Sequence, residues 1–247
     1  SQAATVTGYT AYAAPANVAE AGKVNYTAET FEPNSGYEIS KSNEPFVKET
    51  LTDGKLTIEP GTTYYIRKAA SGDVPASEAI ELVIPARPDA PVESAFTQTA
   101  ESVENKKDGS FGGITEAMEY SINGGEWISG PKTLTDLSNE TVKVRYKATT
   151  EAFKSEEYSY TFTPSTAKLT VTMGENSVEV AYDSLVSKPA DPEKSGYTFG
   201  GWYSDEELTQ AWNFDADTVT DNKTLYPKWI ENAVQKAVIT GNVTESD

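Results

Sequence analysis

An internal repeat constrains this fold more than any other feature of the sequence. Shifting the 247-residue chain along itself by 78 positions aligns two segments without a gap. The shift places Arg67 on Arg145 and Ser77-Glu78 on Ser155-Glu156. A repeat of this length predicts two successive copies of one small structural unit.

Apolar and polar residues alternate within both copies, which is the pattern of half-buried strands. The alternating positions are Ile80, Leu82 and Ile84 in the first copy and Tyr158, Tyr160 and Phe162 in the second. Earlier alternating runs are centred on Tyr64-Ile66 and on Val142-Val144. Each copy is therefore predicted to end in two strands joined by a loop that contains Ser and Glu.

Further upstream, each copy has a shorter apolar segment that predicts another strand. These segments are Gly36 to Ser40 and Glu119 to Ile122. The second continues through Asn123-Gly124-Gly125 into Glu126-Trp127-Ile128, and this turn chemistry predicts a β-hairpin. Almost no stretch of the chain predicts a convincing amphipathic helix.

Prolines mark the junctions between the predicted units. The segment from Pro85 to Pro91 also contains Pro88, and such a segment forms a short, stiff linker rather than a central strand. A second junction is predicted at Thr163-Pro164-Ser165-Thr166. We therefore expect one β-sandwich module at 1–86 and a related one at 87–165. Residues 1–13 are interpreted as a linker, a preceding strand or the first strand of that first module.

Composition excludes several classes of activity. The chain has no Cys and no His, so thiol, imidazole and Ser-His-Asp chemistry and disulfides are all excluded. Its formal net charge of −18 disfavours binding to nucleic acid or anionic membranes. No apolar run approaches the roughly 20 residues of a membrane span. No secretion signal opens the chain, and we interpret Ser1 as the edge of a mature segment, so this absence indicates no compartment.

The segment from Ile58 to Arg67 contains Pro60-Gly61 followed by Tyr64. It resembles the corner before strand F of a fibronectin type III or related immunoglobulin-like domain, where the Tyr hydroxyl satisfies an upstream backbone group. The second copy keeps the turn at Leu137 to Val142 but has no Tyr there. The resemblance implies immunoglobulin-like β-sandwiches, and it is more specific in the first copy.

A third segment, at 166–231, has a different pattern. Residues 168–182 predict a strand, a turn around Gly174-Glu175-Asn176 and a second strand, and a proline-containing loop follows at 189–192. Gly196-Tyr197-Thr198-Phe199-Gly200-Gly201-Trp202-Tyr203 comes next, and Thr224-Leu225-Tyr226-Pro227-Lys228-Trp229 closes the segment. Alternation across residues 197–202 predicts a central strand in a small sheet. Pro227 lacks a backbone donor, so the last strand is predicted to lie at an edge or to bend there.

This segment closely resembles the Listeria–Bacteroides repeat, the B-repeat family named after internalin B. Pro227 stands where the family usually has Ala. The resemblance implies a small β-grasp-like domain and a secreted, modular bacterial surface protein. The predicted architecture is therefore all-β, with two tandem immunoglobulin- or fibronectin-like sandwiches followed by one B-repeat domain. The tail 232–247, with Ala237-Val238-Ile239-Thr240, is predicted to be a linker or to begin a further module.

Four tryptophans are candidates for core or for ligand stacking. Trp202 and Trp229 are predicted to be core, because so small a domain needs large buried side chains. Trp127 and Trp212 are the candidate sugar-stacking residues, and each could equally plug the space beneath a loop. No pair of acids suggests general acid–base catalysis, so no catalytic residue is predicted.

Two acidic segments allow more than one interpretation. Asp215-Ala216-Asp217 with Asp221-Asn222 has the oxygen spacing of a Ca²⁺ loop but lacks other EF-hand features, so a solvated acidic loop is favoured. Asp205-Glu206-Glu207 fits either a solvated loop or the start of a short helix. We predict no metal site and no cofactor.

These observations predict a non-catalytic stalk or spacer segment of an extracellular bacterial surface protein, with an adhesion role as an option. The segment is expected to be a monomeric part of a longer chain. The alternative is a set of accessory modules that bind carbohydrate or a host protein for a larger enzyme or adhesin.

Overall fold

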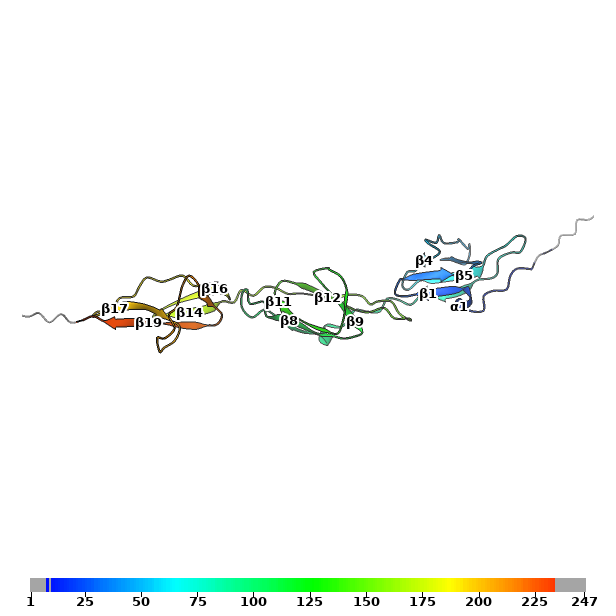
Figure 1. Cartoon of the computed structure of the whole chain (residues 1–247). Helices are drawn as coiled ribbons and strands as arrows, with labels where there is room; N and C mark the ends of the chain where they lie inside the picture. The colour runs from blue at the N-terminus through cyan, green and yellow to red at the C-terminus, as the bar shows by residue number, and fades with distance from the viewer. Residues whose placement is uncertain (1–7, 9, 234–247) are drawn as a thin grey trace, which may run out of the picture. The chain divides into compact units, whose positions relative to one another are not determined.

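The computed structural model describes residue 8 and residues 10–233, and nearly all of its regular structure is β-strand (Figure 1). Within this part the helical segments are α1 (Val18–Ala21) and the 3-10 turn η1 (Glu93–Ala95). The predicted all-β class is confirmed. The described residues divide into two compact units, the first with residues up to 98, 111–134 and 140–161, the second with 99–110, 135–139 and residues from 162 on.

Two antiparallel three-stranded sheets form the N-terminal part of the first unit. One has the strand order β1 (Gly22–Asn25), β2 (Thr30–Pro33), β4 (Leu56–Thr57). The other has the order β3 (Tyr37–Ser40), β5 (Thr63–Lys68), β6 (Ile80–Val83). The alternation predicted for β5 is confirmed, because Tyr64 and Ile66 are fully buried in one cluster with Phe31 and Ile39.

The tyrosine corner of the first copy is confirmed in atomic detail. The Tyr64 hydroxyl accepts a hydrogen bond from the backbone N–H of Glu59 at 3.0 Å. Gly61 takes a positive φ of 74°, as the Pro-Gly turn requires. Val142 occupies the matching position in the second copy and is also buried, so that copy keeps the packing without the hydroxyl.

The second copy contains a four-stranded sheet and a three-stranded sheet. The first has the order β10 (Ile128–Ser129), β9 (Met118–Ile122), β12 (Thr141–Tyr146), β13 (Tyr158–Thr161). The predicted hairpin is confirmed by the pairing of Ile128 with Tyr120. The second has the order β11 (Lys132–Leu137), β8 (Gly109–Ile114), β7 (Thr97–Thr99), and its strands contribute residues to both units.

The second unit holds a mixed four-stranded sheet. Its order is β15 (Asn176–Val180), β14 (Leu169–Met173), β19 (Lys223–Glu231), β17 (Tyr197–Tyr203). The predicted hairpin is confirmed by β14 and β15, while β14 and β19 are parallel. A small ladder of β16 (Ser184–Leu185) and β18 (Thr218–Val219) accompanies this sheet.

The prediction that residues 197–202 form a central strand is wrong, because β17 lies at the edge of its sheet. An irregularity at Gly201 interrupts the alternation in this strand. The register against β19 shifts between Phe199 and Trp202, and Gly201 has a φ of +109°. This bulge changes which residues share a face, so the aromatic residues on either side of it can both contribute to packing.

The prediction that the strand containing Pro227 lies at an edge is wrong for the strand as a whole, although Pro227 itself lies beyond the part paired with β14. Strand β19 lies between β14 and β17, but β14 pairs only with residues 223–225. At Pro227 the strand therefore pairs on one side only, with Trp202 just after the bulge. A residue without a backbone N–H is better tolerated where its strand has a partner on one side only.

The ends of the chain limit two predictions. Residues 10–13 are not in a strand, while residues 1–7 and 9 lie outside the described part. The strand predicted at Ala237–Thr240 also lies outside the described residues. The module boundaries at 86, 165 and 231 stay predictions.

Candidate binding site

Trp127 lies in the loop between β9 and β10, where Arg145 covers one face of its ring. The guanidinium carbon is 3.6 Å from the ring centroid, and Nε of Arg145 donates to Glu119 at 2.7 Å. Arg145 and Glu119 are directly opposed on β12 and β9. This face of Trp127 is therefore occupied by a cross-strand ion pair, and its role in sugar stacking stays a prediction.

The first copy reproduces this arrangement with a different aromatic residue. Arg67 pairs with Glu38 across β5 and β3, and its Nε donates to the carboxylate at 2.8 Å. Phe46, in the loop after β3, lies with its ring centroid 3.7 Å from the guanidinium carbon. The repeat therefore conserves between its own copies a Glu–Arg–aromatic stack, which sequence reasoning identified only as the matched pair Arg67 and Arg145.

A pocket lies beside the arginine in each copy. We call them the first-copy pocket, of about 310 Å³, and the second-copy pocket, of about 220 Å³. The first-copy pocket is lined by Asn43, Glu44, Phe46, Arg67, Ala76, Ser77, Glu78 and Ala79. The second-copy pocket is lined by Arg87, Arg145, Lys154, Ser155, Glu156 and Glu157.

One serine in each copy fixes the loop beside these pockets. Buried Ser77 accepts from the backbone N–H of Lys68 and donates to the carbonyl of Glu78. Ser155 makes the same bonds with Tyr146 and Glu156. Both pockets therefore rest on loops with matching geometry.

Trp212 packs against the core of the second unit. Its backbone N–H donates to the carbonyl of Trp202 at 2.8 Å, and the Lys223 ammonium is 5.7 Å from its ring centroid. Its indole Nε1 is buried and has no hydrogen-bond partner among the described residues. A polar pocket of about 460 Å³ borders it, so ligand contact by Trp212 stays a prediction beside its observed packing role.

Trp202 is core, as predicted, with 5 % of its surface exposed. Trp229 is only half-buried. Phe199 joins the two, with ring centroids 5.6 Å from Trp202 and 5.7 Å from Trp229. The three rings form one aromatic layer across β17 and β19.

The acidic segments bind their own backbone. Asp217 accepts from the backbone N–H of Asn213 at 2.7 Å, and Asn222 accepts from that of Thr170 at 2.8 Å. Asp205 caps a turn rather than a helix, by accepting from Thr209 and Gln210. In the described part of the chain, no group of three or more acidic side chains is placed to hold a metal ion.

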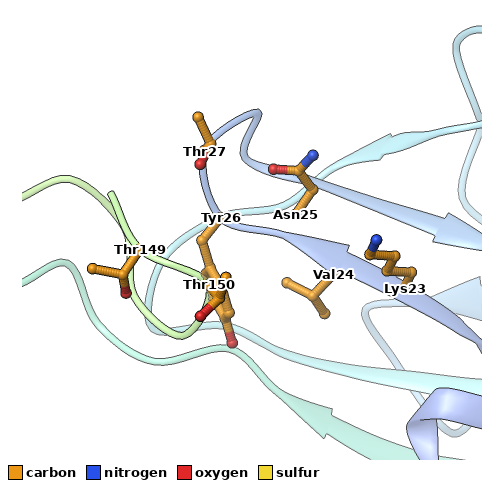
Figure 2. Close-up of a pocket in the computed structure, with 7 residues that line it drawn as sticks. All are labelled: Lys23, Val24, Asn25, Tyr26, Thr27, Thr149 and Thr150. Carbon is orange, nitrogen blue, oxygen red and sulfur yellow. The ribbon is translucent and has the colours of Figure 1, made fainter. Parts of the chain in front are cut away.

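Another pocket, of about 220 Å³, lies beside β1 (Figure 2). Thr149 and Thr150 stand on one loop near Tyr26, and Val24 and Lys23 line the strand behind. Its polar groups are hydroxyls, one amide and one ammonium, without a carboxylate to act as general base. This set can contact a ligand but does not form acid–base machinery.

A loop of the second copy completes the core of the first. Phe153, between β12 and β13, is 1 % exposed and belongs to the cluster of Phe31 and Tyr64. Its ring meets Tyr26 edge-on at 5.0 Å. Sequence reasoning missed this residue, although the first copy has Pro75 at the matching position, a difference that marks the loop as specialised.

Charged groups surround Phe153. The Arg87 guanidinium donates to both carboxylate oxygens of Glu29 and to the carbonyl of Lys154. The Lys154 ammonium is 3.2 Å from Glu29. The hydrogen bonds from Arg87 hold the pKa of Glu29 below its ordinary value. We call Phe153, Tyr26, Glu29, Arg87 and Lys154 the Phe153 junction.

A comparable set of contacts lies within the second unit, around Glu101. Burial alone would raise the pKa of Glu101, but bonds donated by the backbones of Lys107 and Ser165 and by the Ser138 hydroxyl lower it. Nearby, Glu104 pairs with the Lys168 ammonium, and Val103 packs against the core of this unit. The loop between β7 and β8 is thereby tied to the start of β14.

The sequence profile of the Listeria-Bacteroides repeat domain matches residues 158–228. This range begins at the first residue of β13 and contains β13 to β18 and most of β19. The sequence-based identification of this domain is confirmed, and its match starts eight residues before the predicted start at 166.

The chain is similar to parts of several known proteins, among them the following three. Two proteins of Evansella cellulosilytica, both named as membrane proteins and one as Gly-rich, are 52% and 54% identical over 52 residues each. Internalin H of Listeria monocytogenes is 32% identical over 91 residues. These matches cover 21%, 21% and 36% of this chain and only 8%, 6% and 17% of the relatives, so the chain corresponds to a small part of each. No helix among the described residues is long and apolar enough to cross a membrane.

Proposed function

We propose that this chain is a non-catalytic stalk or spacer segment of a bacterial cell-surface protein, exposed outside the cell. The Listeria-Bacteroides repeat and the similarity to internalin H support a repeat module of a surface protein. The names of the Evansella relatives agree with attachment to a membrane-bound protein. We further propose that the modules have the boundaries 1–86, 87–165 and 166–231.

The observation that carries this proposal is the Phe153 junction. A spacer transmits position or force only if neighbouring modules do not swing freely. Phe153 comes from the second copy, yet it is buried with core residues of the first. Proline at 85, 88 and 91 restricts the backbone of the segment that carries Arg87.

Single-molecule force spectroscopy of the full chain tests the load-bearing role. We expect Phe153→Ala to lower the force at which the first copy unfolds, because the substitution leaves a cavity in its core. Phe46→Ala is the matched control, since Phe46 is a half-buried ring outside that core. Equal unfolding forces for wild type and Phe153→Ala would contradict the proposal.

The rival function, recognition of a glycan or host protein, is tested by glycan arrays and pull-down with the same chain. A spacer is expected to give no specific capture. Specific capture that is lost in Trp127→Ala or Trp212→Ala would replace the spacer with a binding module.

A further inference from the structure

The two arginine pockets differ in one informative respect: the second-copy pocket is filled by charges of the chain itself. Oε1 of Glu157 lies 3.6 Å from Nη1 of Arg145. Oε1 of Glu156 lies 3.6 Å from Nε of Arg87. Glu157 and Arg87 therefore add a carboxylate and a guanidinium beside Arg145 and Glu156 in this pocket.

Both of these groups are missing from the first-copy pocket. Ala79 stands at the position of Glu157, and among the described residues that line this pocket the only basic side chain is that of Arg67. The first-copy pocket is correspondingly larger, at about 310 Å³ against about 220 Å³.

The charged groups that remain in the first-copy pocket have unused bonding capacity. Arg67 bonds to Glu38 through Nε alone, and none of the described residues accepts a hydrogen bond from its Nη1 or Nη2. Glu78, which matches Glu156, has no ion-pair partner within the described part of the chain. Phe46 stacks on the guanidinium and fixes its plane, so both Nη atoms are held ready for a planar, two-pronged acceptor.

The charged side chains that line the first-copy pocket determine which ligands can bind to Arg67. Glu38 neutralises Arg67, and Glu44 and Glu78 add two carboxylates to the lining. A simple anion would therefore be repelled, whereas a ligand that also carries a cation satisfies both signs. A volume of about 310 Å³ suits a small molecule of amino-acid size.

We propose that the first-copy pocket binds a zwitterionic ligand of the amino-acid class, with its carboxylate on Nη1 and Nη2 of Arg67 and its guanidinium or ammonium group against Glu78. Such a ligand takes the places that Glu157 and Arg87 hold in the second copy. The site requires no assumption about the spacer role of the chain.

Titration of the ¹⁵N-labelled full chain with L-arginine, followed by NMR, tests this site. We expect saturable shifts of the amide signals of Arg67, Glu78 and Ala79, with a dissociation constant on the order of 1 mM because exposed ion pairs are weak. Agmatine, which lacks the carboxylate, and acetate, which lacks the cation, are expected to bind at least fivefold more weakly. Absence of saturation, or equal shifts at Arg145 and Glu157, would overturn the proposal.

Two reciprocal substitutions make the test specific. Ala79→Glu recreates the second copy, which folds with a Glu at that position, and is expected to weaken arginine binding at least tenfold. Glu157→Ala frees Arg145 while Arg87 still provides the cation, so acetate is expected to shift the Arg145 signals. Unchanged arginine binding by Ala79→Glu would show that Arg67 is not the carboxylate site.

Discussion

At the residue scale, Tyr64 shows how one hydroxyl stabilises a domain that has no disulfide. It is fully buried, and its oxygen is the acceptor for the backbone N–H of Glu59. Removing the oxygen leaves that N–H without its acceptor, which costs the desolvation of a polar group.

We therefore expect Tyr64→Phe to lower the free energy of unfolding by about 1–3 kcal/mol, as measured by urea unfolding. Tyr65→Phe is the matched control. Tyr65 is the next residue along the strand, and its hydroxyl makes no hydrogen bond with the described residues. Equal losses for the two variants would mean that the corner bond contributes nothing.

Some residue roles could be predicted from sequence and others could not. Tyr64 was predictable because the corner is local: the turn, the apolar position and the hydroxyl lie within one short segment. Phe153 was not, because its burial depends on contact between loops far apart in the chain. Period-two alternation says which side of a strand is apolar, but it does not say which core a loop residue enters.

At the scale of elements, the conformation of β17 depends on the bulge at Gly201, which interrupts the alternation of side chains between the two faces of the strand. Gly201 has a φ of +109°, a conformation that side-chain-bearing residues rarely adopt. Gly112 in β8 has no such constraint, and a Cβ there would meet no atom closer than 3.9 Å.

We expect Gly201→Ala to destabilise the second unit by about 1–3 kcal/mol because of backbone strain, while Gly112→Ala changes stability far less. Thermal unfolding followed by tryptophan fluorescence measures the difference, since Trp202 adjoins the bulge. A harmless Gly201→Ala would show that the strand readjusts its register.

The loop between β7 and β8 depends on an ionised carboxylate. Asp108 accepts from the Ser102 hydroxyl at 2.6 Å and from its backbone N–H at 2.7 Å, and these bonds lower its pKa to about 2. A pKa that is lower in the folded protein stabilises the fold above the unfolded value near 3.8, and this contribution disappears as the pH falls through about 2.

Asp108→Asn is therefore expected to lower stability near neutral pH and to differ little from wild type at about pH 2. Denaturant unfolding at both pH values measures this change. Asp215→Asn, at a carboxylate with no recorded bond in the described structure, controls for loss of charge. The same destabilisation at both pH values would contradict a role for the ionised form.

At the scale of the whole molecule, the sequence repeat predicted two successive modules of similar fold. It did not predict which residues from outside a module contribute to its core. The repeat reports what the two copies share, such as the strands, the serine loops and the Arg–Glu pairs. The contacts of Phe153 and the unfilled first-copy pocket depend on where the copies differ, at positions 75 and 153 or 79 and 157. The positions at which the copies differ therefore determine the contacts and pockets that distinguish them. The sequence shows these differences, but their effect on packing can be judged only once the contacts are known.

The two compact units predict a separable response to substitution. Phe153 completes a core of the first unit, whereas Val103 packs against the core of the second. Phe153→Ala removes a fully buried ring and is expected to cost about 3–5 kcal/mol, with Val103→Ala costing less. Amide hydrogen exchange should show faster exchange in β2 and β5 for Phe153→Ala, with β14 and β19 unchanged, and the reverse pattern for Val103→Ala. If either substitution accelerated exchange equally in all four strands, the described chain would unfold as one cooperative body rather than as two.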